Sequence, residues 1–156
     1  MFPARVGMQE QPHPGERGRM NVSDVNRSIL LVEDHPGIRR ILRMAFEHAG
    51  FRTLEAATGQ QALDALAEPG VGAVVLDPGL PDGFGRAVVE RLETLASLGD
   101  GPVWVVLSAG DLEEAKRRYG VSAVNFVRKP FDPLTLVSGL EDLMALAMRK
   151  DLADGV

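Results

Sequence analysis

Five polar side chains in this sequence stand after apolar runs, where they could act together. Glu33 and Asp34 follow one such run, Asp77 a second and Ser108 a third, and Lys129 comes shortly after a fourth. Unit charges about 4 Å apart repel each other by roughly 4 kcal/mol at an effective dielectric constant near 20, so a fold that gathers these carboxylates needs a compensating cation or protonation of a carboxylate. Carboxylate oxygens suit an Mg²⁺ ion that keeps several waters. The residue types therefore predict a site for a divalent cation, flanked by an ammonium group and a hydroxyl.

The elements that must position these side chains alternate regularly from Ser28 onward. Short apolar or alternating runs predict strands at residues 28–33, 51–56, 71–76, 102–107 and 122–127. The segments between the strands show the apolar spacing of helices. The first helix has one stripe, made of Ile38, Ile41, Leu42, Ala45, Phe46 and Ala49. His35 precedes this stripe, so we expect it at the start of the helix rather than among metal ligands.

Capping residues support the same element boundaries. Gly50 suits the left-handed position that ends the first helix. Three later helices open on residues that favour the N-cap position, namely Thr58, Asp111 and Asp132. The last of these helices turns its apolar residues inward, and they are Leu136, Val137, Leu140, Leu143, Met144 and Ala147.

Five strand–helix units in succession predict an α/β fold, a doubly wound parallel sheet with helices on both faces. In such sheets, reactive groups gather beyond the carboxyl ends of the strands. The polar residues that follow the first, third, fourth and fifth strands therefore belong at one edge of the sheet.

Composition restricts the class of protein. The chain has 156 residues, a formal net charge of −5 and no cysteine, which excludes disulfides and thiolate metal sites and argues against a general nucleic-acid binder. No apolar run approaches the roughly 20 residues needed to span a bilayer, and none suits a secretory signal. We expect a cytoplasmic protein with a disordered N-terminal extension at 1–27, a folded domain at 28–149 and a flexible tail at 150–156. Met20 is an alternative start.

Four segments of the sequence resemble one family, the receiver domain of bacterial two-component response regulators. The segments are LLVEDHP, VVLDPGLPDGFG, VVLSA and FVRKPF, which occur in the family's order and spacing within about residues 28–148. The resemblance implies a flavodoxin-like fold similar to that of the chemotaxis response regulator. Its five-stranded sheet has the order 2-1-3-4-5 and its five helices complete a three-layer sandwich.

The resemblance also implies roles for the acidic residues. Asp77 corresponds to the phosphoacceptor. Asp34, Asp77 and the Gly79 carbonyl correspond to direct Mg²⁺ ligands, and Glu33 acts mainly through water.

The remaining site residues correspond to the parts of a phosphorylation switch. Lys129 pairs with the phosphoryl group, and Ser108 hydrogen-bonds one of its oxygens. Ser108 and Phe126 occupy the switch positions, and the family implies a cis peptide bond between Lys129 and Pro130.

Several positions depart from the family pattern. Pro78 follows the phosphoacceptor and has no N–H to donate to a phosphoryl group. Ser108 lacks the methyl group of the commoner threonine, and Phe126 lacks the hydroxyl of tyrosine. Gly79 and Gly110 stand at loop positions that influence phosphoryl lifetime in the family, so we expect an aspartyl phosphate that is not unusually long-lived.

The output surface is expected on the fourth helix, the fifth strand and the fifth helix. Leu112, Lys116, Tyr119 and Arg128 mix apolar and basic character there. The last helix is followed by too few residues for a helix-turn-helix, so we expect a stand-alone receiver that acts through an unidentified protein target, or through a homodimer using this surface, without direct DNA or membrane binding.

The resemblance implies that a histidine kinase or phosphotransfer protein supplies the phosphoryl group, and that the chain is a phosphoacceptor switch rather than an enzyme. Two other functions remain open. A phosphate-independent interaction scaffold is favoured by Pro78. A Mg²⁺-dependent phosphatase with an aspartate nucleophile is disfavoured, because Gly79 stands where a second acid is needed and no segment could enclose a substrate.

Overall fold

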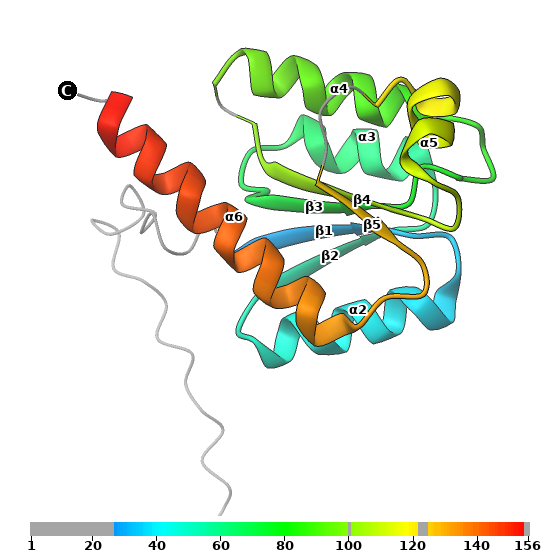
Figure 1. Cartoon of the computed structure of the whole chain (residues 1–156), viewed down its shortest axis with the longest axis horizontal. Coiled ribbons are helices and arrows are strands. Elements are labelled where there is room, and N and C mark those ends of the chain that lie inside the picture. Colours follow the sequence, from blue (N-terminus) through cyan, green and yellow to red (C-terminus); the bar gives the residue numbers. More distant parts are fainter. Residues whose placement is uncertain (1–26, 100, 122–124, 155–156) are drawn as a thin grey trace, which may run out of the picture.

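The computed structural model describes residues 27–99, 101–121 and 125–154. Strands and helices alternate along these residues (Figure 1). The strands are β1 (Ser28–Val32), β2 (Arg52–Ala56), β3 (Ala73–Leu76), β4 (Val103–Ser108) and β5 (Asn125–Arg128). The helices are α2 (Pro36–His48), α3 (Gly59–Ala67), α4 (Gly85–Ser97), α5 (Leu112–Tyr119) and α6 (Pro133–Asp154). Residues 122–124 of the predicted fifth strand lie outside the described part of the chain.

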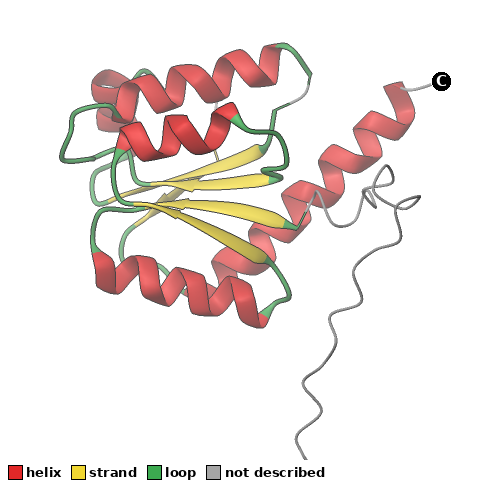
Figure 2. Cartoon of the chain, turned by 180° about the vertical axis from the view of Figure 1, so that it is seen from behind, coloured by secondary structure: helices red, strands yellow, loops and turns green. Residues whose placement is uncertain are grey.

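The strands form one 5-stranded sheet in the order β2-β1-β3-β4-β5, and every neighbouring pair is parallel. Helices α3, α4 and α5 cover one face of this sheet, and α2 and α6 cover the other (Figures 1 and 2). The predicted doubly wound fold and its strand order are confirmed. All carboxyl ends of the strands consequently meet at one edge of the sheet.

Successive residues of the central strands supply two separate cores. In β1, Leu30 and Val32 join the cluster beneath α3 and α4, whereas Ile29 and Leu31 join the cluster beneath α2 and α6. All four side chains are fully buried. A strand covered on both faces needs apolar residues at every position, which explains the continuous apolar run in the sequence.

Capping contacts begin the helices where the sequence predicts. The side chains of His35, Thr58 and Asp111 each accept a hydrogen bond from the backbone N–H three residues further on, at 3.2, 3.2 and 2.8 Å. Asp132 accepts one from the N–H two residues on, at 2.9 Å. Gly50 has the positive φ of 89° expected of the residue that ends α2.

Helix α6 is longer than predicted. It continues to Asp154, so the segment 150–156 expected as a flexible tail is helical through residue 154. The last part of the helix contains alanine, leucine, methionine, lysine and arginine, which all favour helix, and the next glycine is Gly155. Its first half packs on the sheet, but Leu146 is 59% exposed because the second half extends past the sheet (Figure 1).

The structure also differs from the predicted α2 stripe at Ile41, a residue that is 51% exposed. Ile41 lines an apolar hollow of about 530 Å³ together with Ile38, Pro130 and Phe131. The loop after β5 approaches this end of α2 without covering it. Helical spacing placed Ile41 on the inward stripe, but the width of the covered surface depends on that loop.

The predicted disordered extension lies outside the described residues except for Arg27. Its guanidinium group donates a hydrogen bond to the Ala49 carbonyl at 3.1 Å and lies 5.0 Å from the centre of the Phe51 ring. The folded part therefore begins at least one residue earlier than predicted. None of the helices in the described ranges is both long and apolar enough to cross a membrane.

Candidate functional site

Backbone hydrogen bonds continue past the strand ends and hold the predicted site residues at one edge. The Glu33 N–H donates to Ala56, and the Asp77 N–H donates to Val32, at 3.0 and 2.9 Å. The Lys129 N–H donates to the Ser108 carbonyl at 2.9 Å. The sheet itself thus brings side chains from distant parts of the sequence to the same edge.

The three carboxylates predicted to meet do so. Glu33, Asp34 and Asp77 each offer one oxygen, and these oxygens lie within 4.8 Å of one another. The Glu33 side chain is 1% exposed and that of Asp77 is 15% exposed, whereas Asp34 is an exposed residue. The cluster is anchored in the core and opens toward solvent on the Asp34 side.

Lys129 bridges two of these acids. Its Nζ donates to Oδ2 of Asp77 at 2.6 Å and to Oε2 of Glu33 at 2.9 Å. Burial alone lowers the pKa of Lys129, but the hydrogen bonds and charges of Asp77 and Glu33 outweigh it, so the pKa of Lys129 is raised. The ammonium group therefore stays charged at neutral pH and offsets part of the carboxylate repulsion.

Glu33 is the most buried acid of the cluster. Burial raises its pKa most strongly, the hydrogen bond from Lys129 lowers it, and the charge of Asp77 raises it again, with a net increase. Its Oε1 accepts from the His35 N–H at 3.3 Å, while its carbonyl accepts from Arg39 at 2.8 Å. These contacts fix Glu33 in one orientation beneath the more exposed acids.

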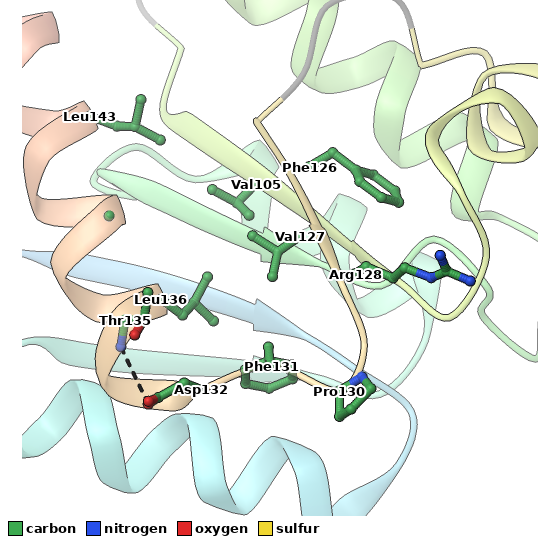
Figure 3. Close-up of a pocket in the computed structure, with 11 residues that line it drawn as sticks. Val105, Phe126, Val127, Arg128, Pro130, Phe131, Asp132, Thr135, Leu136 and Leu143 are labelled. Carbon is green, nitrogen blue, oxygen red and sulfur yellow. Dashed lines mark hydrogen bonds between the residues drawn. The ribbon is translucent and has the colours of Figure 1, made fainter.

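Ser108 is the last residue of β4, and Phe126 lies on β5. The Ser108 Oγ accepts from the Gly110 N–H at 3.2 Å. Phe126 packs against the core cluster beneath α3 and α4, on the opposite side of β5 from Val127, which points toward α6 (Figure 3). The peptide bond between Lys129 and Pro130 is cis, as the resemblance implies.

A second hollow of about 640 Å³ separates β5 from α6 (Figure 3). It is lined by Val105, Val127, Leu136 and Leu143, with Gly139 on the helix side. Phe126 also lines this hollow.

The loop from Asp77 to α4 is held by very close packing. Oδ1 of Asp77 accepts from the Gly79 N–H at 2.9 Å, which fixes the carboxylate on its own loop. A Cβ on Gly85 would overlap the carbonyl oxygen of Pro78, and one on Gly59 would come within 2.5 Å of Phe84. Both glycines are therefore required by the path of this loop.

Asp82 joins the same loop to α3. Its carboxylate accepts hydrogen bonds from the N–H groups of Gly59 and Gln60 at 3.1 and 3.0 Å, and from Phe84 at 3.3 Å. The bond from Gln60 makes the largest contribution to lowering the pKa of Asp82. A helix begins with unpaired N–H groups, and here a side chain from another loop pairs with two of them.

The donor set fits a hard divalent cation. Three carboxylates and one ammonium group leave a formal charge of −2, which a divalent ion neutralises. The donors are oxygens, and the exposed Asp34 side leaves room for the waters that Mg²⁺ retains. Asp34 and Asp77 could coordinate it directly, with the more deeply buried Glu33 behind them.

Comparison with known proteins decides the family. The sequence model of the response regulator receiver domain matches residues 29–141. This chain belongs to the response regulator receiver family. Receiver domains are phosphoacceptor switches that bind Mg²⁺ at an acidic pocket and interact with histidine kinases or phosphotransfer proteins.

Individual relatives agree with this assignment. The receiver is 33% identical over 118 residues to the phosphate regulon transcriptional regulatory protein PhoB of Klebsiella pneumoniae, covering 76% of this chain and 52% of PhoB. It is 31% identical over 108 residues to sporulation initiation phosphotransferase F of Bacillus subtilis, covering 69% and 86%. The solved structure of chemotaxis response regulator CheY4 of Vibrio cholerae matches with a TM-score of 0.63 and 25% identity, covering 74% of this chain and 96% of CheY4. The matched region is thus about half of PhoB but most of the other two proteins.

Two residues near the site of this receiver were not predicted to be there. Asp82 lies in the glycine- and proline-rich loop after Asp77, where the sequence assigns it no role, although an acid in a loop before a helix is a common capping residue. Tyr119 is expected on the output surface; in the structure it is partly exposed and packs against the core cluster beneath α3 and α4. No local pattern identifies the element that either side chain reaches.

Proposed function

We propose that this receiver accepts a phosphoryl group on Asp77 from a histidine kinase or phosphotransfer protein, in a reaction that depends on Mg²⁺. The observation that carries the proposal is the placement of the Asp77 carboxylate. It is partly exposed at the sheet edge, 2.6 Å from the Lys129 ammonium group and within one cluster with Glu33 and Asp34. An accessible carboxylate between a lysine and a cation-binding acid pair is suited to nucleophilic attack on phosphorus.

The residues of the chain divide the chemistry between them. A carboxylate oxygen of Asp77 forms the new bond to phosphorus while the bond to the donor's imidazole nitrogen breaks, and that nitrogen keeps the electron pair. Phosphoryl transfer needs alignment and charge neutralisation more than covalent assistance. Lys129 neutralises charge on the transferring group, and the N–H of Gly79 holds the acceptor carboxylate in place. When bound, Mg²⁺ adds positive charge that stabilises the phosphoryl oxygens.

Apolar surface beside the site supports a protein as the donor. The hollow lined by Ile38, Ile41, Pro130 and Phe131 also includes Lys129, so it is continuous with the acidic site. A small phosphodonor needs no such surface. We place the contact with the histidine-bearing protein here.

The acidic site is connected to the proposed output face through Ser108 and Phe126. A phosphoryl oxygen that attracts the Ser108 hydroxyl would free it from its contact with Gly110 and open space for Phe126 to move inward. The output face then comprises α5, β5 and α6, with Lys116 and Arg128 exposed on it. We place the unidentified protein target, or a second copy of this receiver, on that face. We also propose that the chain works in the cytoplasm as a switch. Its only catalysis is then its own phosphorylation and dephosphorylation.

One observation favours a second function. Pro78 cannot donate a backbone hydrogen bond to a phosphoryl group, and its carbonyl is enclosed against Gly85. A receiver with a weakened phosphoryl site could act as a phosphate-independent interaction scaffold on the same fold.

The deciding experiment is intact mass measurement after incubation with phosphoramidate, with and without Mg²⁺. We expect one phosphoryl group on the wild type in the presence of Mg²⁺ only, and none on Asp77→Asn. Asp142→Asn, an exposed acid on α6, is the matched control and should be modified like the wild type. Absence of modification on the wild type would support the scaffold, and repeated turnover of a small phosphate ester would support an enzyme.

A further inference from the structure

The space beside the acceptor carboxylate is bounded by an unexpected hydroxyl group. A Cβ placed on Gly79 would lie 3.3 Å from Oδ1 of Asp77 and 3.4 Å from the hydroxyl oxygen of Tyr119. Apart from the chain neighbours of Gly79, these are the only atoms of the described residues within 4 Å of that point. Because Gly79 has no Cβ, the Asp77 carboxylate and the Tyr119 hydroxyl both border a gap beside this residue.

The position of this hydroxyl is set by packing rather than by chance exposure. The Tyr119 ring packs against the buried cluster beneath α3 and α4. Tyr119 is the last residue of α5, and Gly120 ends the helix with a φ of 71° and lies close to Arg86 on the first turn of α4. The end of α5 is thus held beside the start of α4, which directly follows the Asp77 loop, and the aromatic side chain reaches that loop.

The hydroxyl fills a chemical need of this particular loop. The residue directly after Asp77 is Pro78, which has no N–H, and the N–H of Gly79 is already donated to Oδ1 of Asp77. A phosphoryl group on Asp77 brings new acceptor oxygens that need donors. The Tyr119 O–H is a donor that faces the same gap.

We propose that Tyr119 is a phosphoryl-binding residue whose hydroxyl donates a hydrogen bond to an oxygen of the phosphoryl group on Asp77. This inference rests on the proposed function, since it needs Asp77 to be the acceptor. It also gives the phosphoryl group a direct contact with α5, an element of the proposed output face. Phosphorylation would then act on α5 through Tyr119 as well as through Ser108 and Phe126.

Tyr119 can be observed by itself because the chain contains a single tyrosine. The full chain labelled with 3-fluorotyrosine gives one ¹⁹F resonance, recorded with Mg²⁺ alone and then with phosphoramidate. We expect the resonance to move when the intact mass shows one phosphoryl group, and to stay in place in Asp77→Asn.

A second measurement separates hydrogen bonding from packing. Tyr119→Phe keeps the ring and loses only the oxygen, so its thermal unfolding should match the wild type. A hydrogen bond to a charged group contributes enough that its loss should shorten the aspartyl phosphate lifetime by about tenfold. Ser97→Ala, which removes a hydroxyl at the other end of α4, is the control and should keep the wild-type lifetime.

The outcomes distinguish the two proposals. A phosphorylated wild type with an unmoved ¹⁹F resonance, or an unchanged lifetime in Tyr119→Phe, would overturn the role of Tyr119 and leave the proposed function standing. A wild type that takes no phosphoryl group at all would overturn both.

Discussion

The Nζ of Lys129 lies 2.6 Å from Oδ2 of Asp77, a contact between residues 52 positions apart in the sequence. The same nitrogen also donates to Glu33, whose side chain is almost fully buried. One lysine therefore compensates two acids that the fold forces together. Removing it leaves both acids without their cation.

Replacement of Lys129 by methionine should lower the free energy of unfolding at pH 7 by about 1–3 kcal/mol, because it leaves buried acceptors unpaired. The measurement is urea denaturation followed by the fluorescence of Trp104. The pKa of Lys129 is raised above its ordinary value of 10.5, so its contribution is complete below pH 10.5 and is lost as the pH rises through the folded value. The difference in the free energy of unfolding between wild type and Lys129→Met should become smaller above pH 10.5. Lys116→Met, on the exposed face of α5, should change the free energy of unfolding little. An equal decrease in both variants would contradict the role of Lys129 in compensating the two acids.

Addition of Mg²⁺ should raise the melting temperature of this receiver. An ion that binds only the folded state stabilises it by about 2.7 kcal/mol at a free concentration 100-fold above its dissociation constant. The measurement is thermal unfolding across a Mg²⁺ titration, with reversal by EDTA. Asp34→Asn should remove most of the increase, because Asp34 is the accessible carboxylate of the cluster. Asp142→Asn should retain the increase in melting temperature. An equal increase in both variants would show that the ion binds elsewhere.

Replacement of Asp82 by alanine should destabilise the fold at neutral pH and much less in acid. Hydrogen bonds, chiefly from the Gln60 N–H, lower the pKa of Asp82 below its ordinary value of 3.8. A carboxylate of this kind stabilises the folded state fully above pH 3.8, and that stabilisation is lost as the pH falls through the folded value. Urea denaturation at several pH values measures the difference between variant and wild type. The control is Asp64→Ala on α3, because the Asp64 carboxylate accepts from the Gln60 side chain rather than from a backbone N–H of that helix. If the difference in the free energy of unfolding between Asp82→Ala and wild type does not become smaller in acid, the hydrogen bonds of Asp82 to α3 are not its cause.

Two glycine-to-alanine substitutions should change the free energy of unfolding in opposite directions. At Gly85 the new methyl group would overlap the Pro78 carbonyl, and such overpacking costs about 1–3 kcal/mol. At Gly139, within α6, no described atom other than its chain neighbours and the nearby helix backbone lies within 4 Å of the new Cβ, so the helix preference of alanine should add about 0.5–1 kcal/mol to the free energy of unfolding. Chemical denaturation of both variants tests the pair. Gly85→Ala should also slow phosphorylation, since it displaces the loop that carries Asp77, whereas Gly139→Ala should not.

Much of this molecule is determined within short stretches of the sequence. Strand and helix periods, the side-chain caps at His35, Thr58 and Asp111, and the placement of acids after strands all depend on residues a few positions apart. Because parallel strands end at one edge, this was sufficient to predict that Glu33, Asp34 and Asp77 meet.

Only the packed structure decides which side chains reach across from one element to another. The two hydrogen bonds of Lys129, the attachment of Asp82 to α3, the approach of Tyr119 to Gly79 and the exposure of Ile41 depend on the paths of loops and on how far helices extend. Such distances result from the packing of many residues distant in the sequence, so no local spacing contains them.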